Sequence, residues 1–140
     1  MDLGMIGVAA VLGISAIGSA IGAGTAGQAA IGSWKRSYLA NKPASFLLVV
    51  FAGAPLTQTI YGFILMQRML SSEADSGLLL GAGVIGGLAM GMSAIAQGLA
   101  GAAGSDAFGE TGKGFGQYIT VVGLCETVAL FVMAFTFGAI

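Results

Sequence analysis

The sequence contains no histidine, one cysteine and few charged residues, which make up 8% of its 140 residues. Without histidine it lacks the commonest transition-metal ligand and the side chain that usually exchanges protons near pH 7. One cysteine cannot form a disulfide within the chain. Soluble domains carry about 25% charged residues, whereas this chain is 56% hydrophobic, which also excludes disorder. A net charge of −1 without a basic stripe gives nucleic acid no surface to bind.

Four long apolar runs occupy most of the chain, separated by polar breaks at 34–43, 71–76 and 105–113. Each run exceeds the roughly 20 residues that a helix needs to cross the hydrocarbon core of a bilayer. Helices also satisfy their own backbone hydrogen bonds, as lipid requires. We therefore expect an all-α membrane protein with four transmembrane helices. The four runs are residues 3–33, 44–70, 77–104 and 114–140.

The first run differs from a secretory signal peptide. Asp2 is acidic, no positively charged segment precedes the run, and the run is far longer than the apolar part of a signal peptide. We expect it to be a retained transmembrane helix.

The basic residues predict the orientation of the chain in the membrane. The first and third breaks contain Lys35, Arg36, Lys42 and Lys113, whereas the opposite side has only Arg68. Because cytoplasmic loops carry the excess of lysine and arginine, the loops between spans 1 and 2 and between spans 3 and 4 should be cytoplasmic. Both termini should then lie outside.

The second half of the chain repeats the first. Gly-Ile-Ser-Ala-Ile at 13–17 matches Gly-Met-Ser-Ala-Ile at 91–95, and Leu-Thr-Gln-Thr at 56–59 matches Leu-Cys-Glu-Thr at 124–127. We expect a duplicated helical hairpin. The two hairpins are residues 1–72 and 73–140, and the second carries the essential carboxylate.

The repeat is symmetric in shape and asymmetric in charge. In the alignment Gln58 takes the place of Glu126, and Ser19 takes the place of Gln97. A carboxylate therefore occurs in only one of the two hairpins.

Small residues dominate the first and third spans, and bulky ones the second and fourth. Gly18 and Gly22 are four residues apart, as are Gly83, Gly87 and Gly91, which places them on one helix face and lets backbones approach closely. Thin helices beside thick ones suggest an inner and an outer layer, and repeated hairpins could close into a homo-oligomeric ring. Ordinary packing within a monomeric bundle is the alternative.

Glu126 lies inside an otherwise uncharged apolar span. A charge there costs at least about 2.5–3.5 kcal/mol on insertion scales, so such a residue is a functional-site hypothesis by default. Thr57, Gln58 and Gln97 lie at a comparable depth, counted from the cytoplasmic ends of their spans. We expect the four side chains to meet in one layer near the middle of the membrane.

Pro55 adds backbone oxygen to this layer. It has no N–H, so the carbonyl of Phe51 loses its helical partner, and carbonyls freed at this depth need a donor or a cation. Hydroxyl, amide, carbonyl and carboxylate oxygens suit a hard cation. Since Glu126 is the one charge, a monovalent ion, Na+ or H+, would leave the site neutral. The alternative is that Thr57 and the two glutamines only bond helices together.

Three segments resemble the membrane rotor subunit (K or c, proteolipid) of V-type ATPases, and most closely its bacterial Na+-translocating branch. They are Pro-Leu-Thr-Gln-Thr-Ile-Tyr-Gly at 55–62, Ser-Ala-Ile-Ala-Gln-Gly at 93–98 and Cys-Glu-Thr at 125–127. The likeness covers essentially the whole chain. One departure is Leu56, where the related rotors have glycine after the proline.

The resemblance implies a set of Na+ ligands, with H+ as the competing ion. Tyr61 is implied to hydrogen-bond the carboxylate of Glu126. The implied ligands are the side chains of Thr57, Gln58, Gln97 and Glu126 and the backbone carbonyl of Ala54.

The resemblance also implies the partners and the setting. The chain would form a ring with copies of itself in the plasma membrane, in contact with lipid. A stator subunit would supply an arginine, and a central-stalk subunit would meet the cytoplasmic loops. ATP hydrolysis would occur on other subunits, so this chain would not be an enzyme by itself. One carboxylate per four helices suits an ATP-driven pump better than a synthase.

Three other functions remain open from the sequence. The same ring could carry protons, with Gln58 and Gln97 only holding a protonated Glu126. The chain could be a stand-alone channel or porter. It could also be a scaffold that transports nothing.

Overall fold

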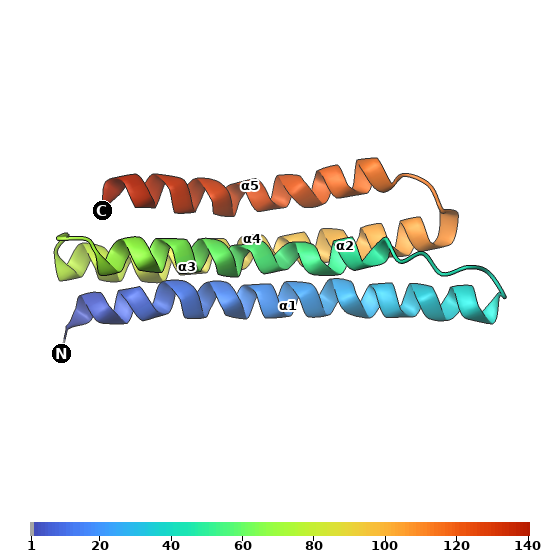
Figure 1. Ribbon diagram of the computed structural model, residues 1–140, viewed down its shortest axis with the longest axis horizontal. Helices are drawn as coiled ribbons and strands as arrows, with labels where there is room; N and C mark the ends of the chain where they lie inside the picture. The colour runs from blue at the N-terminus through green and yellow to red at the C-terminus, as the bar shows by residue number, and fades with distance from the viewer. Residues whose placement is uncertain (1) are drawn as a thin grey trace.

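The computed structural model describes residues 2–140, and in this part of the chain it contains helices and no strands (Figure 1). Four stretches are long and apolar enough to cross a membrane, which confirms the predicted all-α membrane fold. The helices are α1 (Leu3–Leu39), α2 (Leu48–Gly53), the 3₁₀ turn η1 (Ala54–Leu56), α3 (Thr57–Leu70), α4 (Ser76–Thr111) and α5 (Phe115–Ala139).

The spans run antiparallel along the chain. Figure 1 shows the N-terminus, the C-terminus and the turn between α3 and α4 at one end of the bundle, hereafter the terminal end. The connections from α1 to α2 and from α4 to α5 lie together at the other end, hereafter the loop end. The two breaks that hold most of the basic residues therefore lie on the same side, as two hairpins require.

Two helices are longer than the sequence predicts. α1 continues to Leu39 and α4 to Thr111, which is six and seven residues past their expected ends. Polar side chains after an apolar run do not interrupt a helix that emerges into water. The helices end where the backbone turns left-handed nearby, at Asn41 with φ 51° and at Gly112 with φ 66°. Much of the first and third polar breaks is therefore helical.

The second span begins later than predicted and contains an irregular turn. Its helix starts at Leu48 and not at residue 44, because residues 44 and 45 are irregular and residues 46 and 47 form a turn. Trp34 Nε1 donates to the Ser45 carbonyl at 2.7 Å and holds this segment against α1. Pro55 then replaces one turn of α-helix by η1.

Glycines let α1 and α4 pack backbone to backbone. A Cβ atom at Gly18 would lie closer than 3.0 Å to the backbone of Gly91, and one at Gly98 would lie as close to Gly22. Any larger residue would force the helices apart. α1 and α4 form one layer, and α3 and α5 lie side by side on it.

Two apolar clusters fill the bundle. The cluster toward the terminal end is Val8, Val11, Leu65, Met69, Met90 and Ala129. The cluster toward the loop end is Ala30, Leu48, Phe51 and Val122. On α3 and α5, the polar residues Gln58 and Glu126 lie between the two clusters. A polar layer in the middle of the spans therefore separates two apolar layers.

Candidate ion-binding site

Glu126 lies on α5 and faces donors from two other helices. Tyr61 of α3 donates its hydroxyl to Oε1 of Glu126 at 2.6 Å. Gln97 of α4 donates from Nε2 to Oε2 at 3.2 Å. Each carboxylate oxygen therefore has its own donor, and the side chain is half-buried at the junction of three helices.

The two glutamines form the buried part of the site. Both side chains are 0% exposed, so their polar atoms must find partners inside the bundle. Gln58 Nε2 donates to Gln97 Oε1 at 2.8 Å, and Gln97 Nε2 also donates to the Val122 carbonyl at 3.0 Å. These bonds join α3, α4 and α5 in one layer and orient both amides.

The proline turn brings Thr57 and a backbone carbonyl into the same network. The Thr57 hydroxyl lies 3.1 Å from the Ala54 carbonyl oxygen and 3.2 Å from Gln58 Oε1. Both residues lie beside Pro55, where η1 replaces the α-helix. The turn therefore presents three oxygens of different kinds at one point of the second span.

Leu56 does not disturb this turn. Its side chain is 53% exposed, on the outside of the bundle, and its backbone is right-handed helical, with φ −77° and ψ −20°. That conformation does not require glycine. The departure from the family pattern at Leu56 thus falls on a surface position.

The structure brings together all the residues that the sequence analysis singled out. Tyr61 bonds Glu126, Glu126 bonds Gln97, Gln97 bonds Gln58, and Thr57 links Gln58 to the Ala54 carbonyl. These contacts form one continuous hydrogen-bonded chain across three helices. Their roles as ligands stay predictions.

The comparison with known families points to the same part of the chain. The profile of the family described as the C subunit of ATP synthase matches residues 80–138. These residues cover most of α4 and α5 and include Gln97 and Glu126.

The second hairpin thus matches the family of ATP synthase C subunits.

One relative is similar to this chain over more of its length. It is the K subunit of the A-type ATP synthase of Methanocaldococcus jannaschii, which is 36% identical over 132 residues. The alignment covers 92% of this chain and 57% of that protein, so the chain spans little more than half the length of its relative. The family profile covers the second hairpin, and this alignment extends the likeness over the first.

The sequence analysis did not identify Ser93 of α4, in the second hairpin, as part of the polar layer. Ser93 is 6% exposed, donates its hydroxyl to the Cys125 carbonyl at 2.7 Å and accepts from Gln58 Nε2 at 3.4 Å. Its position one helical turn before Gln97 places the two on one face of α4. That spacing was the signal in the sequence that could have identified it.

The polar layer receives no cation from within the described residues. The only ion pair in residues 2–140 joins Arg36 to Asp106. Arg68, near the terminal end, donates Nε to the Phe137 carbonyl at 3.3 Å and stacks over the ring of Phe137. Within the described residues, Glu126 is therefore contacted by neutral hydrogen-bond donors.

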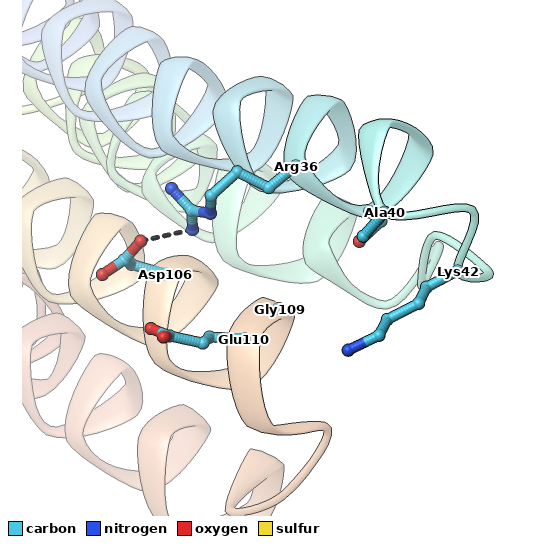
Figure 2. A pocket seen from close by; sticks show the side chains of 7 residues that line it. Arg36, Ala40, Lys42, Asp106, Gly109 and Glu110 are labelled. Atoms are coloured by element: carbon cyan, nitrogen blue, oxygen red, sulfur yellow. Dashed lines mark hydrogen bonds and ion pairs between the residues drawn. The ribbon is translucent and has the colours of Figure 1, made fainter.

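The loop end carries a separate group of charged side chains (Figure 2). Arg36 on α1 and Asp106 on α4 lie 2.5 Å apart, and Lys42 and Glu110 line the same pocket. Because both partners of the ion pair are more than half exposed, such a pair contributes at most about 1 kcal/mol. Asp106 lies nine residues beyond Gln97, roughly 13 Å along the helix, so this group is distinct from the mid-span network.

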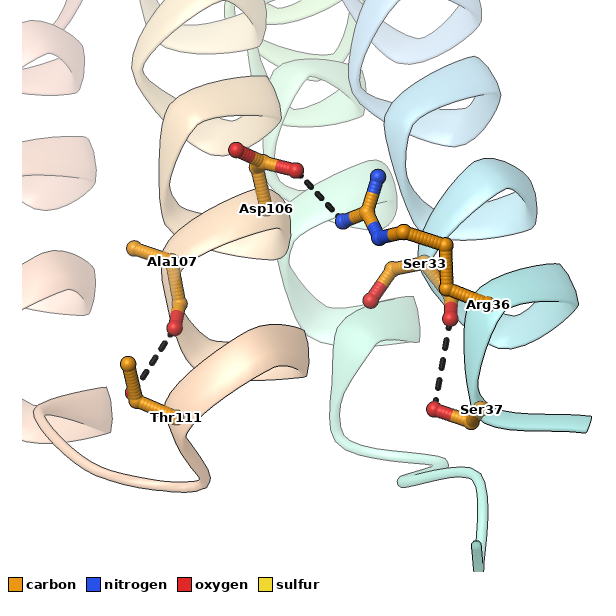
Figure 3. A network of polar contacts seen from close by, with 6 residues as sticks. All are labelled: Ser33, Arg36, Ser37, Asp106, Ala107 and Thr111. Carbon is orange, nitrogen blue, oxygen red and sulfur yellow. Dashed lines mark hydrogen bonds and ion pairs between the residues drawn. The ribbon is translucent and has the colours of Figure 1, made fainter. Parts of the chain in front are cut away.

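Hydroxyls near these helix ends bond their own helices (Figure 3). Ser37 donates to the Ser33 carbonyl at 3.2 Å, and Thr111 donates to the Ala107 carbonyl at 2.7 Å. Each hydroxyl bonds the carbonyl four residues before it on its own helix, beside the helical N–H that the same carbonyl accepts. The loop end is thus a polar cap on the bundle.

Proposed function

We propose that this chain is a rotor-ring subunit of an A/V-type ion-translocating ATPase and that it carries Na+ at Glu126. The match of the second hairpin to ATP synthase C subunits and the likeness to an A-type K subunit support the rotor role. The observation that carries the ion site is the hydrogen-bonded layer that joins Glu126 to Gln97, Gln58 and Thr57. The chain itself is non-catalytic in this proposal, and ATP is hydrolysed on other subunits.

The ligand set follows from the oxygens gathered in this layer. It consists of one carboxylate, two amide oxygens, one hydroxyl and one backbone carbonyl, all of which are hard donors suited to Na+. Both amide groups are buried and use their N–H groups on neighbouring oxygens. Their own oxygens are thereby directed into the network. The proposed ligands are Ala54 (carbonyl), Thr57, Gln58, Gln97 and Glu126.

Charge explains the preference for a monovalent ion. The site holds one carboxylate and otherwise neutral groups, so Na+ makes it neutral, whereas a divalent ion would leave one positive charge in lipid. Charge at this depth is expensive. A proton would also neutralise Glu126, but it would leave the buried amide and hydroxyl oxygens without a function in transport.

Neutralisation couples ion binding to rotation. With Na+ bound, Glu126 can face lipid while the ring turns. After the ion leaves, the bare carboxylate must meet water or a cation. No basic side chain of the described residues reaches it. We infer that an arginine on a stator subunit supplies this cation.

The setting of the subunit follows from its two ends. The loop end carries Lys35, Arg36, Lys42 and Lys113, and we propose that it is cytoplasmic and meets a central-stalk subunit. The terminal end then faces the outside of the cell. The membrane in this proposal is the plasma membrane. One carboxylate per four helices moves few ions per turn, and each ion can be driven against a steeper potential, at about 2.3 kcal/mol per 100 mV. We therefore propose that the ATPase containing this subunit works as an ion pump.

Carbodiimide labelling of Glu126 in the purified oligomer tests the ion. The reagent modifies protonated carboxyl groups, so an ion that occupies the site protects Glu126. We expect millimolar NaCl to slow labelling at constant pH, and KCl at equal ionic strength to have little effect. Glu126→Gln is the unlabelled control.

Other outcomes separate the rival functions. If NaCl gives no protection while labelling slows as the pH rises, the ring carries protons. Ion flux through liposomes containing this chain alone would indicate a channel or porter. Unchanged ATP-driven transport in the Glu126→Gln variant would leave only a scaffold role.

A further inference from the structure

α5 carries Glu126 but has few buried side chains to hold it in place. Within Phe115–Ala139 only Val122 and Ala129 are buried, whereas α1 and α4 bury residues along most of their lengths. With so little packing, the rotation of α5 about its axis depends on the hydrogen bonds that reach it from other helices. That rotation decides where the carboxylate of Glu126 points.

The hydrogen bonds that reach α5 fall into two groups. Near the middle of the span, α4 donates through Ser93 and Gln97, and α3 donates through Tyr61. Beyond Glu126, toward the terminal end, Arg68 of α3 is the only donor from another helix among residues 2–140. The terminal half of α5 is thus held by one polar side chain.

Arg68 makes three contacts with the end of α5. Its Nε donates to the Phe137 carbonyl at 3.3 Å, and its guanidinium lies 5.5 Å from the centroid of the Phe137 ring. Its Nη2 donates to the Ile140 carbonyl. The last carbonyls of a helix have no partner within it and form the negative end of its dipole. A charged fork of N–H donors suits both properties, so Arg68 caps a helix other than its own.

Tyr61 and Arg68 reach α5 from the same helix at two different heights. They are seven residues apart on α3, which is about two helical turns. Tyr61 donates to Glu126 at 2.6 Å, and Arg68 donates to Phe137, which lies roughly 16 Å further along α5. Two attachments at separate heights fix both the rotation and the axial position of α5 relative to α3.

We propose that Arg68 is a positioning residue for the ion site, because it anchors the terminal end of α5 and so keeps Glu126 directed at its donors. This role rests on the proposed function, in which Glu126 binds the transported ion. Successive residues of a helix are about 100° apart, so a fraction of that rotation would move the carboxylate away from Tyr61 and Gln97. Hydrogen bonds weaken steeply with such a change in geometry. Arg68 therefore lowers the cost of ordering the site when the ion binds.

The anchor belongs to the first hairpin alone. In the repeat that aligns Gln58 with Glu126, the counterpart of Arg68 is Thr136, which carries no charge. The second hairpin therefore sends no equivalent cation toward the end of α3. The helix that carries the carboxylate is the one that is anchored, as expected if the anchor serves the ion site.

Carbodiimide labelling of the purified oligomer tests whether Arg68 acts on the ion site. Arg68→Gln removes the charge and the fork of donors. We expect it to raise the half-protecting Na+ concentration about two- to tenfold, as for the loss of one hydrogen bond. Arg68→Lys keeps the charge without the fork and should recover part of this loss. Gln67→Ala, at the exposed neighbouring position, is the matched control and should leave protection unchanged.

A spin label on α5 reports the anchor independently of any ion. In a Cys125→Ser background, Gly138→Cys places the label near the anchored end, and Gly116→Cys places it near the loop end. A Cβ atom at either position meets no heavy atom within 4 Å in the chain. We expect Arg68→Gln to raise the mobility of the label at position 138 and to leave it unchanged at position 116.

The outcomes separate the anchor from the ion. Unchanged mobility at position 138 in Arg68→Gln overturns the positioning role and leaves the proposed function standing, as does unchanged Na+ protection in an oligomer intact on native gels. If NaCl does not protect even the unchanged chain, the proposed ion is wrong. The pH of half-labelling is then compared between the unchanged chain and Arg68→Gln, and equal values overturn the positioning role. Phe137→Leu, which removes only the stacked ring, replaces Arg68→Gln if that variant does not assemble.

Discussion

The two hairpins share one architecture and differ in the chemistry of their middle layer. In the second hairpin Gln97 and Glu126 bond each other. At the equivalent positions of the first hairpin stand Ser19, whose buried hydroxyl has no partner within residues 2–140, and Gln58, which bonds across to Gln97. The first hairpin thus contributes its polar groups to the site of the second and forms no second site of its own.

This difference shows that two repeated hairpins can differ in their polar side chains and keep the same fold. Backbone contacts at glycine hold α1 against α4 whether or not a carboxylate is present. The polar layer can therefore change one side chain at a time. Substitutions at equivalent positions of the two hairpins measure how much each residue contributes to the difference between them.

The largest effect is expected from moving the carboxylate. Glu126→Gln should abolish Na+-dependent carbodiimide protection and ATP-driven transport. The double variant Glu126→Gln with Gln58→Glu keeps the charge but places it at a position that is 0% exposed. We expect it to stay inactive, because burial opposes ionisation there and the exchange path is lost. Restored transport in the double variant would show that the hairpins are chemically interchangeable.

The next largest effect is expected from making the second hairpin resemble the first. Gln97→Ser removes donors to Glu126 and to the Val122 carbonyl, and it removes the acceptor of Gln58. Each buried group left unpaired costs about 1–3 kcal/mol. We expect the Na+ concentration for half-protection to rise roughly ten- to a hundredfold. Ser19→Ala is the control, and it should leave protection unchanged.

A smaller effect is expected from the tyrosine that the first hairpin supplies to the second. Tyr61 donates to Glu126 at 2.6 Å, and its counterpart in the repeat is Ala129. Hydrogen bonds to charged groups contribute about 1.5–3 kcal/mol, part of which bound Na+ replaces. We expect Tyr61→Phe to weaken Na+ protection about tenfold. Protection unchanged by this substitution would remove Tyr61 from the site.

The smallest effect is expected from the serine pair. Ser93 bonds the Cys125 carbonyl and Gln58, whereas its counterpart Ser15 bonds only the Val11 carbonyl of its own helix. A net contribution of about 0.5–1.5 kcal/mol corresponds to a shift of roughly two- to tenfold. Ser93→Ala should raise the half-protecting Na+ concentration by that factor, and Ser15→Ala should not. Equal shifts in both variants would mean that the effect reflects packing alone.

Local patterns of the sequence were enough to predict the spans and most of the hydrogen-bonded layer. Hydropathy identifies four spans because lipid selects apolar residues segment by segment. The four polar side chains at one depth, with Pro55 beside them, identified the layer in which Glu126 bonds Gln97. Helix ends were predicted less well, since polar residues at 34–39 and 105–111 extend α1 and α4 into water.

The sequence by itself determined the composition of the polar layer, the duplication and the one-sided placement of the carboxylate. Only the tertiary structure decided that Ser93 and the Val122 carbonyl join the network. It also decided which face of α1 meets α4 and which face is exposed. The physical reason is that bonds between helices depend on their rotation and axial offset. Those quantities are set by close packing at Gly18, Gly22 and their partners over the whole bundle, and no local pattern fixes them.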